Sequence, residues 1–346
     1  MNLTQLRLEN YRCFSVLEID FHPEVTVIVA PDGESKTAIL EAIASALGPF
    51  VGAFDHGKST QIAHQDARYA TGRGGNEDER QYPVIIQAEA LTPQKIQWQR
   101  ALISPKARTT IKGAEPLANW GKQLQTALRK DSRVTLPVVC YHSLNRLWVP
   151  PKTAGRGALT GSRTAGYQNA LSSDSTYIQL RAWMRTATLA ALQQSTCVGY
   201  ERSNLPERLA LIKNAVDTVT ADDRLSNFHY SLSLDNLAMS HREHGDIPLE
   251  SLSDGDQAVI LLVADLALRC IRLNGGLGVN VHRESTGIAL IDEPDLDLSP
   301  ALQLRVLKNL REAFPKIQFI LGTCNSRLLS KVKGENIRVI SQDHLG

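Results

Sequence analysis

The stretch "VIVAPDGESKTAILEAI" (residues 27–43) passes from an apolar segment through a short loop into apolar residues at helical spacing. The loop ends in Lys36 and Thr37, as in the phosphate-binding pattern G-x-x-x-x-G-K-[ST]. Ala30 and Ser35 stand where that pattern has its first and last glycines. Taken alone, the stretch is a weak indication of a nucleotide site, so its surroundings decide the interpretation.

The segments around this loop predict strands and helices in the order that a phosphate loop requires. Residues 25–30 are continuously apolar and β-branched, which is typical of a strand covered on both faces. Residues 3–14 and 15–21 alternate between apolar and polar, and predict two half-buried antiparallel strands that turn near Tyr11–Ser15. Further elements are expected at 82–91 (strand) and at 117–129 and 176–194 (helices).

The C-terminal third alternates between buried strands and helices. Strands are expected at 287–293 and 317–323, a largely buried helix at 256–273, and a helix over 299–314 with Ser299 as its N-cap. Strand–helix–strand alternation predicts an α/β fold with a parallel sheet flanked by helices.

Two consecutive acids, Asp292 and Glu293, close the apolar run of "IALIDEPD". The end of a buried strand places them at the carboxyl edge of the sheet, where α/β sites collect. One acid can hold Mg²⁺ together with the hydroxyl of Thr37, and the next can polarise an attacking water.

A second anion-binding pattern precedes the long apolar helix, in "LESLSDGDQ". Ser251, Ser253 and Gly255 stand at its start, where unpaired N–H groups and a partial positive charge face an anion. Ser253 can also be a simple N-cap. A chain with two phosphate-binding patterns is explained if the second one, at the start of this helix, contacts a nucleotide bound by another molecule.

With "LSDG" ahead of "LIDEPD" and an N-terminal Lys-Thr loop, the chain resembles the ABC-type ATPase heads of the SMC/RecF class. The similarity extends to "LRLENYRCFSVLEIDF", "LPVVCYHSLNRLW" and "FPKIQFILGTCNS". The subgroup it looks most like is the RecF-like AAA ATPases of bacterial anti-phage systems, including Septu and retron-associated PtuA-like proteins. The expected fold is an ABC-type P-loop head with an N-terminal antiparallel β-subdomain and a helical insertion.

The resemblance implies a head-to-tail homodimer that sandwiches two ATP molecules with Mg²⁺. Lys36 would hold the β- and γ-phosphates, Thr37 and Asp292 the metal, and Glu293 the catalytic water. Ser253 and Gly255 would face the γ-phosphate bound by the opposite subunit. The other nucleotide-binding residues implied are Arg12, Gln65 and the loop residues Asp32, Gly33, Glu34 and Ser35.

The departures from the family pattern fall on its catalytic parts. Besides Ala30 and Ser35, "GTCNSR" has Cys324 or Asn325 where the family has a switch histidine, and Asp256-Gln257 follows the signature. A non-glycine residue held in a left-handed conformation costs about 1–2 kcal/mol. Loss of a positioned polar group in the transition state costs about 10²–10⁴-fold in rate. Binding should therefore survive better than hydrolysis, and we expect slow turnover.

Composition and charge place the chain among soluble α/β proteins, with a net charge of +2. No long apolar run could span a membrane, no signal segment is recognisable, and five scattered cysteines argue against a disulfide framework or zinc site. A cytoplasmic location is expected. Residues 95–173 carry thirteen Lys/Arg against two acids, which hints at nucleic acid or an acidic protein as partner.

We divide the chain into an N-terminal ATPase lobe (1–94), a basic, mainly helical insertion (95–225) with a mobile loop near 151–166, and a C-terminal lobe (226–346). The leading hypothesis is an ATP-binding regulatory subunit of an anti-phage complex that controls a partner nuclease, expected to be HNH-type. Two alternatives stay open: a non-catalytic scaffold with a vestigial site, and a RecF-like DNA-binding repair ATPase.

Overall fold

The computed structural model describes residues 1–30, 33–71, 78–144, 161–173, 177–196, 204–221 and 224–341. Its centre is a sheet of five parallel strands in the order β14–β3–β13–β12–β8. These strands are β3 (Val25–Val29), β8 (Val138–His142), β12 (Gly287–Asp292), β13 (Ile317–Gly322) and β14 (Ile337–Val339). Every residue of β8, β12 and β13 is buried, which explains their unbroken apolar runs. The predicted parallel sheet is confirmed.

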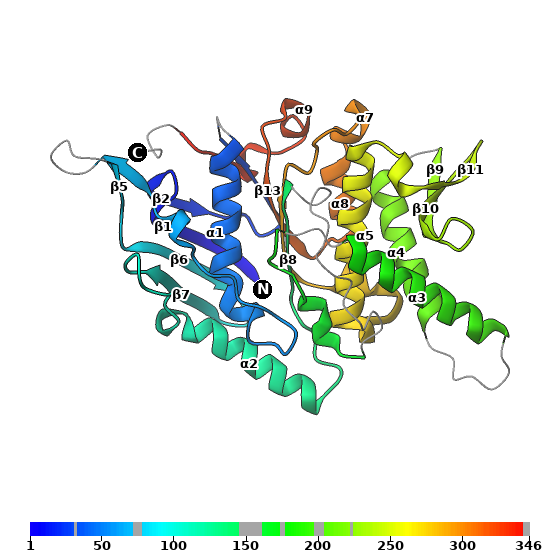
Figure 1. The fold of residues 1–346 in the computed structure, drawn as a ribbon, viewed down its shortest axis with the longest axis horizontal. Helices are drawn as coiled ribbons and strands as arrows, with labels where there is room; N and C mark the ends of the chain where they lie inside the picture. The colour runs from blue at the N-terminus through cyan, green and yellow to red at the C-terminus, as the bar shows by residue number, and fades with distance from the viewer. Residues whose placement is uncertain are drawn as a thin grey trace.

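Helices cover both faces of this sheet, and Figure 1 shows it between α1 and the pair α5 and α8. Helix α1 contacts β12, β13 and β8, while α5 packs on β8 and on α4. The helices are α1 (Gly33–Val51), α2 (Glu115–Lys130), α3 (Tyr177–Thr196), α4 (Leu205–Thr220), α5 (Asp254–Asn274), α6 (Val281–Glu284), α7 (Pro300–Gln303), α8 (Val306–Ala313) and α9 (Ser326–Leu329).

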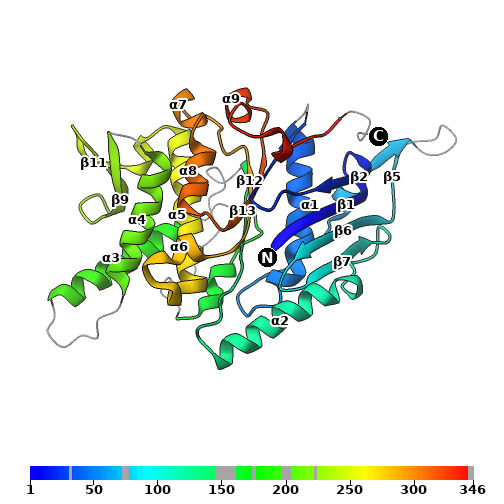
Figure 2. The ribbon, with the colours of Figure 1, turned by 180° about the vertical axis from the view of Figure 1, so that it is seen from behind.

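A four-stranded antiparallel sheet, ordered β2–β1–β6–β7, forms the predicted N-terminal β-subdomain. It lies on the far side of α1 from α5, as Figure 2 shows from behind. Its strands are β1 (Asn2–Tyr11), β2 (Phe14–Asp20), β6 (Val84–Leu91) and β7 (Lys95–Leu102). The buried amide of Gln318 bonds to both backbone groups of Leu3, at 2.8 Å each, and so ties β1 to β13. Trp98 likewise donates to the carbonyl of Ala46 on α1 at 2.8 Å.

Two smaller sheets complete the described strands. One has the order β11–β10–β9 and the other pairs β4 with β5. Their strands are β4 (Tyr69–Thr71), β5 (Asp78–Arg80), β9 (Leu225–Ser231), β10 (Asn236–His241) and β11 (Gly245–Pro248). Within the described residues, no helix has the length and apolar character that a membrane span requires.

The segment 95–225 is less helical than expected. It contains α2, α3 and α4, but also β7, which pairs along its whole length with β6, and β8, which is an edge strand of the central sheet. The boundary at 94–95 therefore separates two paired strands. The three-part division stays a prediction, although its first boundary falls between the paired strands β6 and β7.

Of the predicted mobile loop near 151–166, residues 151–160 lie outside the described residues. Its last part is wrong as a loop: Arg163–Tyr167 is a short 3-10 helix whose Thr164 to Tyr167 are buried. Arg163 donates to the carbonyls of Val134 and Leu273, at 2.5 and 2.7 Å, and Gly166 packs against Leu273. One arginine thus ties residues 163–167 to the carbonyls of Val134 and Leu273.

The helix expected over 299–314 is two helices. Ser299 caps α7 by accepting from the amide of Leu302, as predicted, but α7 ends at Gln303. A second helix, α8, starts at Val306 after the turn at Leu304 and Arg305. The apolar periodicity spans both helices and so hides the break.

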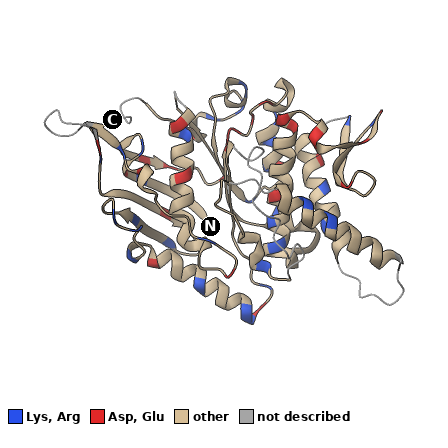
Figure 3. Ribbon diagram, in the orientation of Figure 1, with Lys and Arg blue, Asp and Glu red and all other residues tan. Residues whose placement is uncertain are grey.

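Two of the basic residues in 95–173, Arg100 and Arg163, make contacts inside the fold. Arg100 is buried and donates to the carbonyl of Ser45 at 2.5 Å, and Arg163 is used as described above. Arg129 and Arg133 pair with nearby aspartates on the surface. Figure 3 shows basic positions spread along α2 and across the helices on the opposite side of the molecule. The positive charge excess of this segment therefore includes arginines that bond inside the fold as well as arginines on the surface.

Candidate nucleotide site

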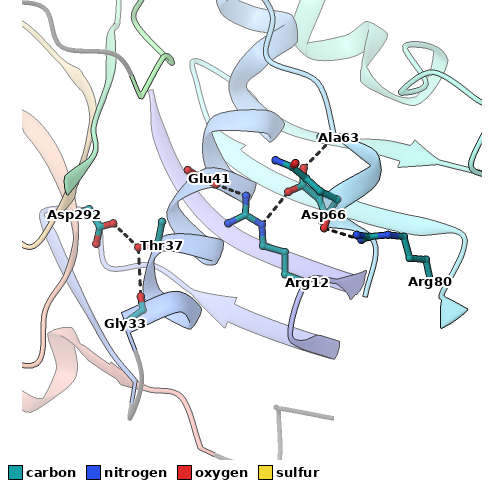
Figure 4. Close-up of polar contacts among 9 residues, drawn as sticks. Arg12, Gly33, Thr37, Glu41, Ala63, Asp66, Arg80 and Asp292 are labelled. Carbon is teal, nitrogen blue, oxygen red and sulfur yellow. Dashed lines mark hydrogen bonds and ion pairs between the residues drawn. The ribbon is translucent and has the colours of Figure 1, made fainter. Parts of the chain in front are cut away.

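The start of α1 meets the end of β12 at the carboxyl edge of the parallel sheet (Figure 4). The hydroxyl of Thr37 donates to Oδ2 of Asp292 at 2.5 Å. Asp292 is completely buried, since β12 is covered on both faces. The two residues are 255 positions apart in the chain, and the sheet brings them together as the sequence predicted.

Lys36 and Glu293 form the second pair at this edge, with Lys36 Nζ 3.5 Å from Glu293 Oε1. The side chain of Lys36 is 2% exposed and that of Glu293 is 16% exposed. Burial raises the pKa of the Glu293 carboxyl; the charge of Lys36 opposes this effect and Asp295 adds to it. Lys36 and Glu293 therefore form an ion pair that is largely shielded from solvent.

Glu293 is held by its backbone as well as by its side chain. Its φ of +43° lies in the left-handed region, which is uncommon for a residue with a side chain. Its amide donates to the carbonyl of Gly322 at 2.8 Å. The chain turns sharply directly after β12, and this turn aims the Glu293 carboxylate at Lys36. Backbone strain of this kind is often found at functional sites.

Gly322, at the end of β13, is a site residue that the sequence analysis missed. A Cβ there would lie 3.1 Å from Cβ of Lys36 and 3.2 Å from Oδ1 of Asp292. The absence of a side chain therefore lets α1 approach the sheet closely enough to bring these two residues together. The available signal was a glycine closing an otherwise apolar strand.

The loop substitutions carry no backbone strain in the residues described. Left-handed conformations among the described non-glycine residues occur elsewhere, and neither Ala30 nor Ser35 adopts one. Ser35 is already within α1, is buried, and lies with its Oγ 3.4 Å from Sγ of Cys13. The expected penalty for the missing glycines is therefore wrong for these two positions. Gly33 and Glu34 are exposed, and Asp32 lies outside the described residues.

Arg12 belongs to a second cluster, built at the turn between β1 and β2 (Figure 4). Its Nε donates to Oδ1 of Asp66 at 2.9 Å, and its guanidinium also pairs with Glu41 on α1. Its amide donates to the carbonyl of Asp66 at 2.7 Å. The second carboxylate oxygen of Asp66 accepts from the amide of Ala63 at 2.8 Å. Asp66 and Glu41, which the sequence analysis missed, thus fix Arg12 beside α1.

Gln65 lies next to this cluster and not beside Lys36. Its side chain is exposed, and its carbonyl accepts from Arg80 at 3.0 Å. Gln65 lines a small cavity together with Arg12, Glu41 and Asp66. Its assignment as a nucleotide sensor stays a prediction.

Removing the Asp66 carboxylate should destabilise the fold. Asp66 is 4% exposed, and Asp66→Ala would leave Ala63 N–H and one side of Arg12 without their acceptor. We expect a loss of about 2 kcal/mol in the free energy of unfolding, measured by urea denaturation. Asp55→Ala is the matched control, because Asp55 and its partner Arg129 are both more than half exposed and such pairs contribute at most about 1 kcal/mol. Equal losses in the two variants would contradict the structural role of Asp66.

Ser253 and Gly255 lie at the start of α5. Ser253 is the N-cap; its Oγ accepts from the amide of Asp256 at 3.2 Å and donates to the Asp256 carboxylate at 2.7 Å. A Cβ on Gly255 would lie 2.3 Å from the carbonyl oxygen of Asp297. This glycine therefore allows close contact between α5 and the loop that follows Glu293. Ser253 is exposed, and within one chain it acts as a helix cap.

The switch position is occupied by groups with local structural roles. Cys324 is exposed, and the side chain of Asn325 caps α9 by accepting from the amide of Arg327 at 2.9 Å. Thr323 is fully buried, and its hydroxyl hydrogen-bonds to Glu293. A neutral hydroxyl therefore contacts the glutamate at the end of β13.

The donor set fits a nucleotide with Mg²⁺. The hydroxyl of Thr37 and the carboxylate of Asp292 are oxygen ligands of the kind Mg²⁺ prefers. The buried ammonium of Lys36 supplies a positive charge, and α1 begins at Gly33 with its N-terminal end at the same edge. Phosphate oxygens can accept hydrogen bonds both from the Lys36 ammonium and from the backbone N–H groups at the start of α1.

A family model for AAA domains, AAA_23, matches residues 5–227 of the chain. The chain belongs to this family. The match covers most of the chain, including the phosphate loop, Arg12, the antiparallel sheet and helices α1 to α4.

Curated relatives of this AAA domain include two probable ATPases of retrons. The Vibrio cholerae serotype O1 biovar El Tor retron Vc95 protein is 32% identical over 41% of the chain, and the Escherichia coli retron Ec83 protein is 38% identical over 25%. The Septu protein PtuA of Bacillus mycoides (strain KBAB4) is 40% identical over 22%. The aligned regions span 27%, 16% and 10% of those three proteins.

Solved structures show the same fold at low sequence identity. An SMC head bound to the C-terminal winged-helix domain of ScpA matches 96% of the chain and 93% of its own, with TM-score 0.56 and 12% identity. An SMC head with an extended coiled coil from Pyrococcus furiosus matches 96% of the chain and 92% of its own, with TM-score 0.52 and 11% identity. The AAA domain thus has the α/β fold of SMC head domains.

Proposed function

We propose that the chain binds ATP with Mg²⁺ at the carboxyl edge of its parallel sheet and hydrolyses it slowly. The observation that carries this proposal is the meeting of Lys36, Thr37, Asp292 and Glu293 in one place, through contacts of 2.5 and 3.5 Å. Membership of the AAA family and the SMC-head fold support it.

Each residue has a distinct task in this proposal. Lys36 binds the β- and γ-phosphates, while Thr37 and Asp292 hold Mg²⁺. The metal, when bound, neutralises charge on the phosphate oxygens. Glu293 orients the attacking water and accepts its proton. Because Lys36 pairs with Glu293 in this structure, ATP must draw the ammonium away from the carboxylate, which prepares Glu293 to accept a proton.

Hydrolysis should depend on pH through Glu293. Its pKa is raised by burial, and loss of the nearby Lys36 charge to the phosphates raises it further. The general base must be ionised, so the rate should fall as pH falls through this raised pKa, which lies above the usual value of 4.5. Single-turnover rates measured from about pH 4 to pH 8, a range that includes the ordinary value of 4.5, check this. A rate that does not change over this range would contradict Glu293 as the base.

Dimerisation is the second part of the proposal. Ser253 is exposed at the start of a 21-residue helix and can reach a nucleotide held by another copy of the chain. A head-to-tail homodimer would use Ser253 and Gly255 in this way. The Asp256 carboxylate beside Ser253 places a negative charge near the expected phosphate, which together with the missing switch histidine favours slow turnover.

The biological role that we propose is regulation of a partner nuclease, expected to be HNH-type, in a cytoplasmic anti-phage complex. The relatives named as retron ATPases and Septu PtuA support this context. The test is to search the neighbouring genes for a nuclease, co-express any such nuclease with the full chain, and co-purify the two with and without ATP. A nuclease that neither co-purifies nor changes activity with ATP would contradict it.

A further inference from the structure

A cavity of about 180 Å³ lies beside α1, between the Arg12 cluster and the end of β8. Arg12, Glu41, Asp66, Tyr11 and Tyr141 are among the residues that line it. It is too small for a nucleotide, because ligand pockets for molecules of that size hold roughly 300 Å³ or more. Its polar lining suits a few water molecules, which need two to four polar partners each.

The two tyrosines place buried hydroxyl groups at this cavity. Tyr11 and Tyr141 are 0% and 5% exposed, and neither hydroxyl has a hydrogen-bond partner among the residues that the structure describes. Burial raises the pKa of both, so each remains a neutral group that can donate one proton. Buried polar groups normally find partners, which points to a ligand with hydrogen-bonding capacity in the cavity.

Tyr141 differs from Tyr11 in its relation to Asp292. Strand β8 runs parallel to β12 with Tyr141 opposite Leu290. Side chains alternate along a strand, so Tyr141 projects from the same face of the sheet as Leu290 and Asp292. The charge of Asp292 acts on Tyr141, as do those of Glu41 and Arg12. The charges that act on Tyr11 are those of the Arg12 cluster.

We propose that Tyr141 is a positioning residue whose hydroxyl reaches Asp292 on the shared face of the sheet and, on its other side, water held in this cavity beside the Arg12 cluster. The inference rests on the proposed ATPase function and adds a residue to it. In this proposal the hydroxyl donates its single proton toward Asp292 and accepts from water in the cavity. It fixes how Asp292 is oriented and does not touch the nucleotide. Its removal should therefore lower the rate of hydrolysis without weakening ATP binding.

The test compares Tyr141→Phe with Tyr11→Phe in the full chain. Each change removes one buried hydroxyl from the same cavity and keeps the ring. Tyr141→Phe should lower the single-turnover rate of ATP hydrolysis by roughly tenfold, as expected for one lost hydrogen bond, with the dissociation constant for ATP within about twofold of wild type. Tyr11→Phe should leave both quantities within about twofold. A single cooperative thermal unfolding transition in each variant confirms that both variants fold.

A Tyr141→Phe rate equal to that of wild type overturns the inference, as does an equal loss of rate in both variants. A loss of ATP affinity with unchanged rate also overturns it, because it makes Tyr141 a binding residue. These results leave the proposed function intact. A wild-type chain that binds no ATP contradicts the proposed function itself, so the two failures are distinguishable.

Discussion

Replacing Lys36 with alanine should raise the dissociation constant for ATP by about 100-fold. A hydrogen bond from a charged group contributes about 1.5–3 kcal/mol, and 1.4 kcal/mol corresponds to a factor of ten. The change also leaves Glu293 facing the phosphates without its positive partner, which adds repulsion. Calorimetric titration of ATP into wild type and variant measures the effect.

Two controls separate loss of binding from loss of folding. Lys36→Met keeps most of the buried volume and should lose ATP affinity to the same extent as Lys36→Ala. Lys308→Ala removes an exposed lysine of α8 and should leave affinity unchanged. If Lys36→Ala and Lys36→Met fold and bind ATP as wild type does, the phosphate-binding role of Lys36 is wrong.

Glu293→Gln should lower the rate of hydrolysis by about 10²–10⁴-fold and leave ATP binding intact. Glutamine has the same shape and keeps a group that can bond to Thr323, but it cannot accept the proton of the attacking water. It also removes the carboxylate that competes with the phosphates for Lys36, so affinity should be equal or higher. Single-turnover phosphate release measures the rate.

The same variant tests the dimer. With hydrolysis blocked, Glu293→Gln should accumulate as an ATP-bound dimer, visible by size-exclusion chromatography with light scattering. Ser253→Arg, at the exposed start of α5, should prevent this dimer without changing ATP affinity. Equal phosphate release from wild type and Glu293→Gln would leave only the scaffold hypothesis.

Much of the fold could be predicted from the sequence because its strands carry strong local signals. The unbroken apolar runs of β3, β12 and β13 predict strands covered on both faces, and the structure confirms this. The alternation in β1 and β2 predicts a half-buried antiparallel pair, also confirmed. The approach of Thr37 to Asp292 follows from parallel strands sharing one carboxyl edge.

The parts that escaped prediction depend on contacts between distant segments. Asp66 precedes no apolar run and matches no motif, and its role appears only when the turn at Arg12 folds onto it. Gly322 is needed because Lys36 approaches from a helix almost three hundred residues earlier. The order of the segment at Arg163 comes from carbonyls of other elements. Local composition carries no information about such contacts.

The glycine substitutions show why a motif mismatch has to be weighed against geometry. Ala30 and Ser35 looked like sources of strain. Ser35 lies inside α1 and Ala30 directly follows β3, and neither has a left-handed backbone conformation. In the proposed site, we expect the weakening to come instead from Asp256 and the switch position, near the expected γ-phosphate. Binding and hydrolysis should therefore be affected very differently.

The central claim is that Lys36, Thr37, Asp292 and Glu293 form one ATP site with Mg²⁺. The most direct measurement is calorimetric titration of ATP into the full wild-type chain, with Mg²⁺ and with EDTA. We expect saturable binding of one ATP per chain that is tighter with Mg²⁺ present and about 100-fold weaker in Lys36→Ala. An absence of binding at millimolar ATP with Mg²⁺, from a chain shown to be folded, would contradict it.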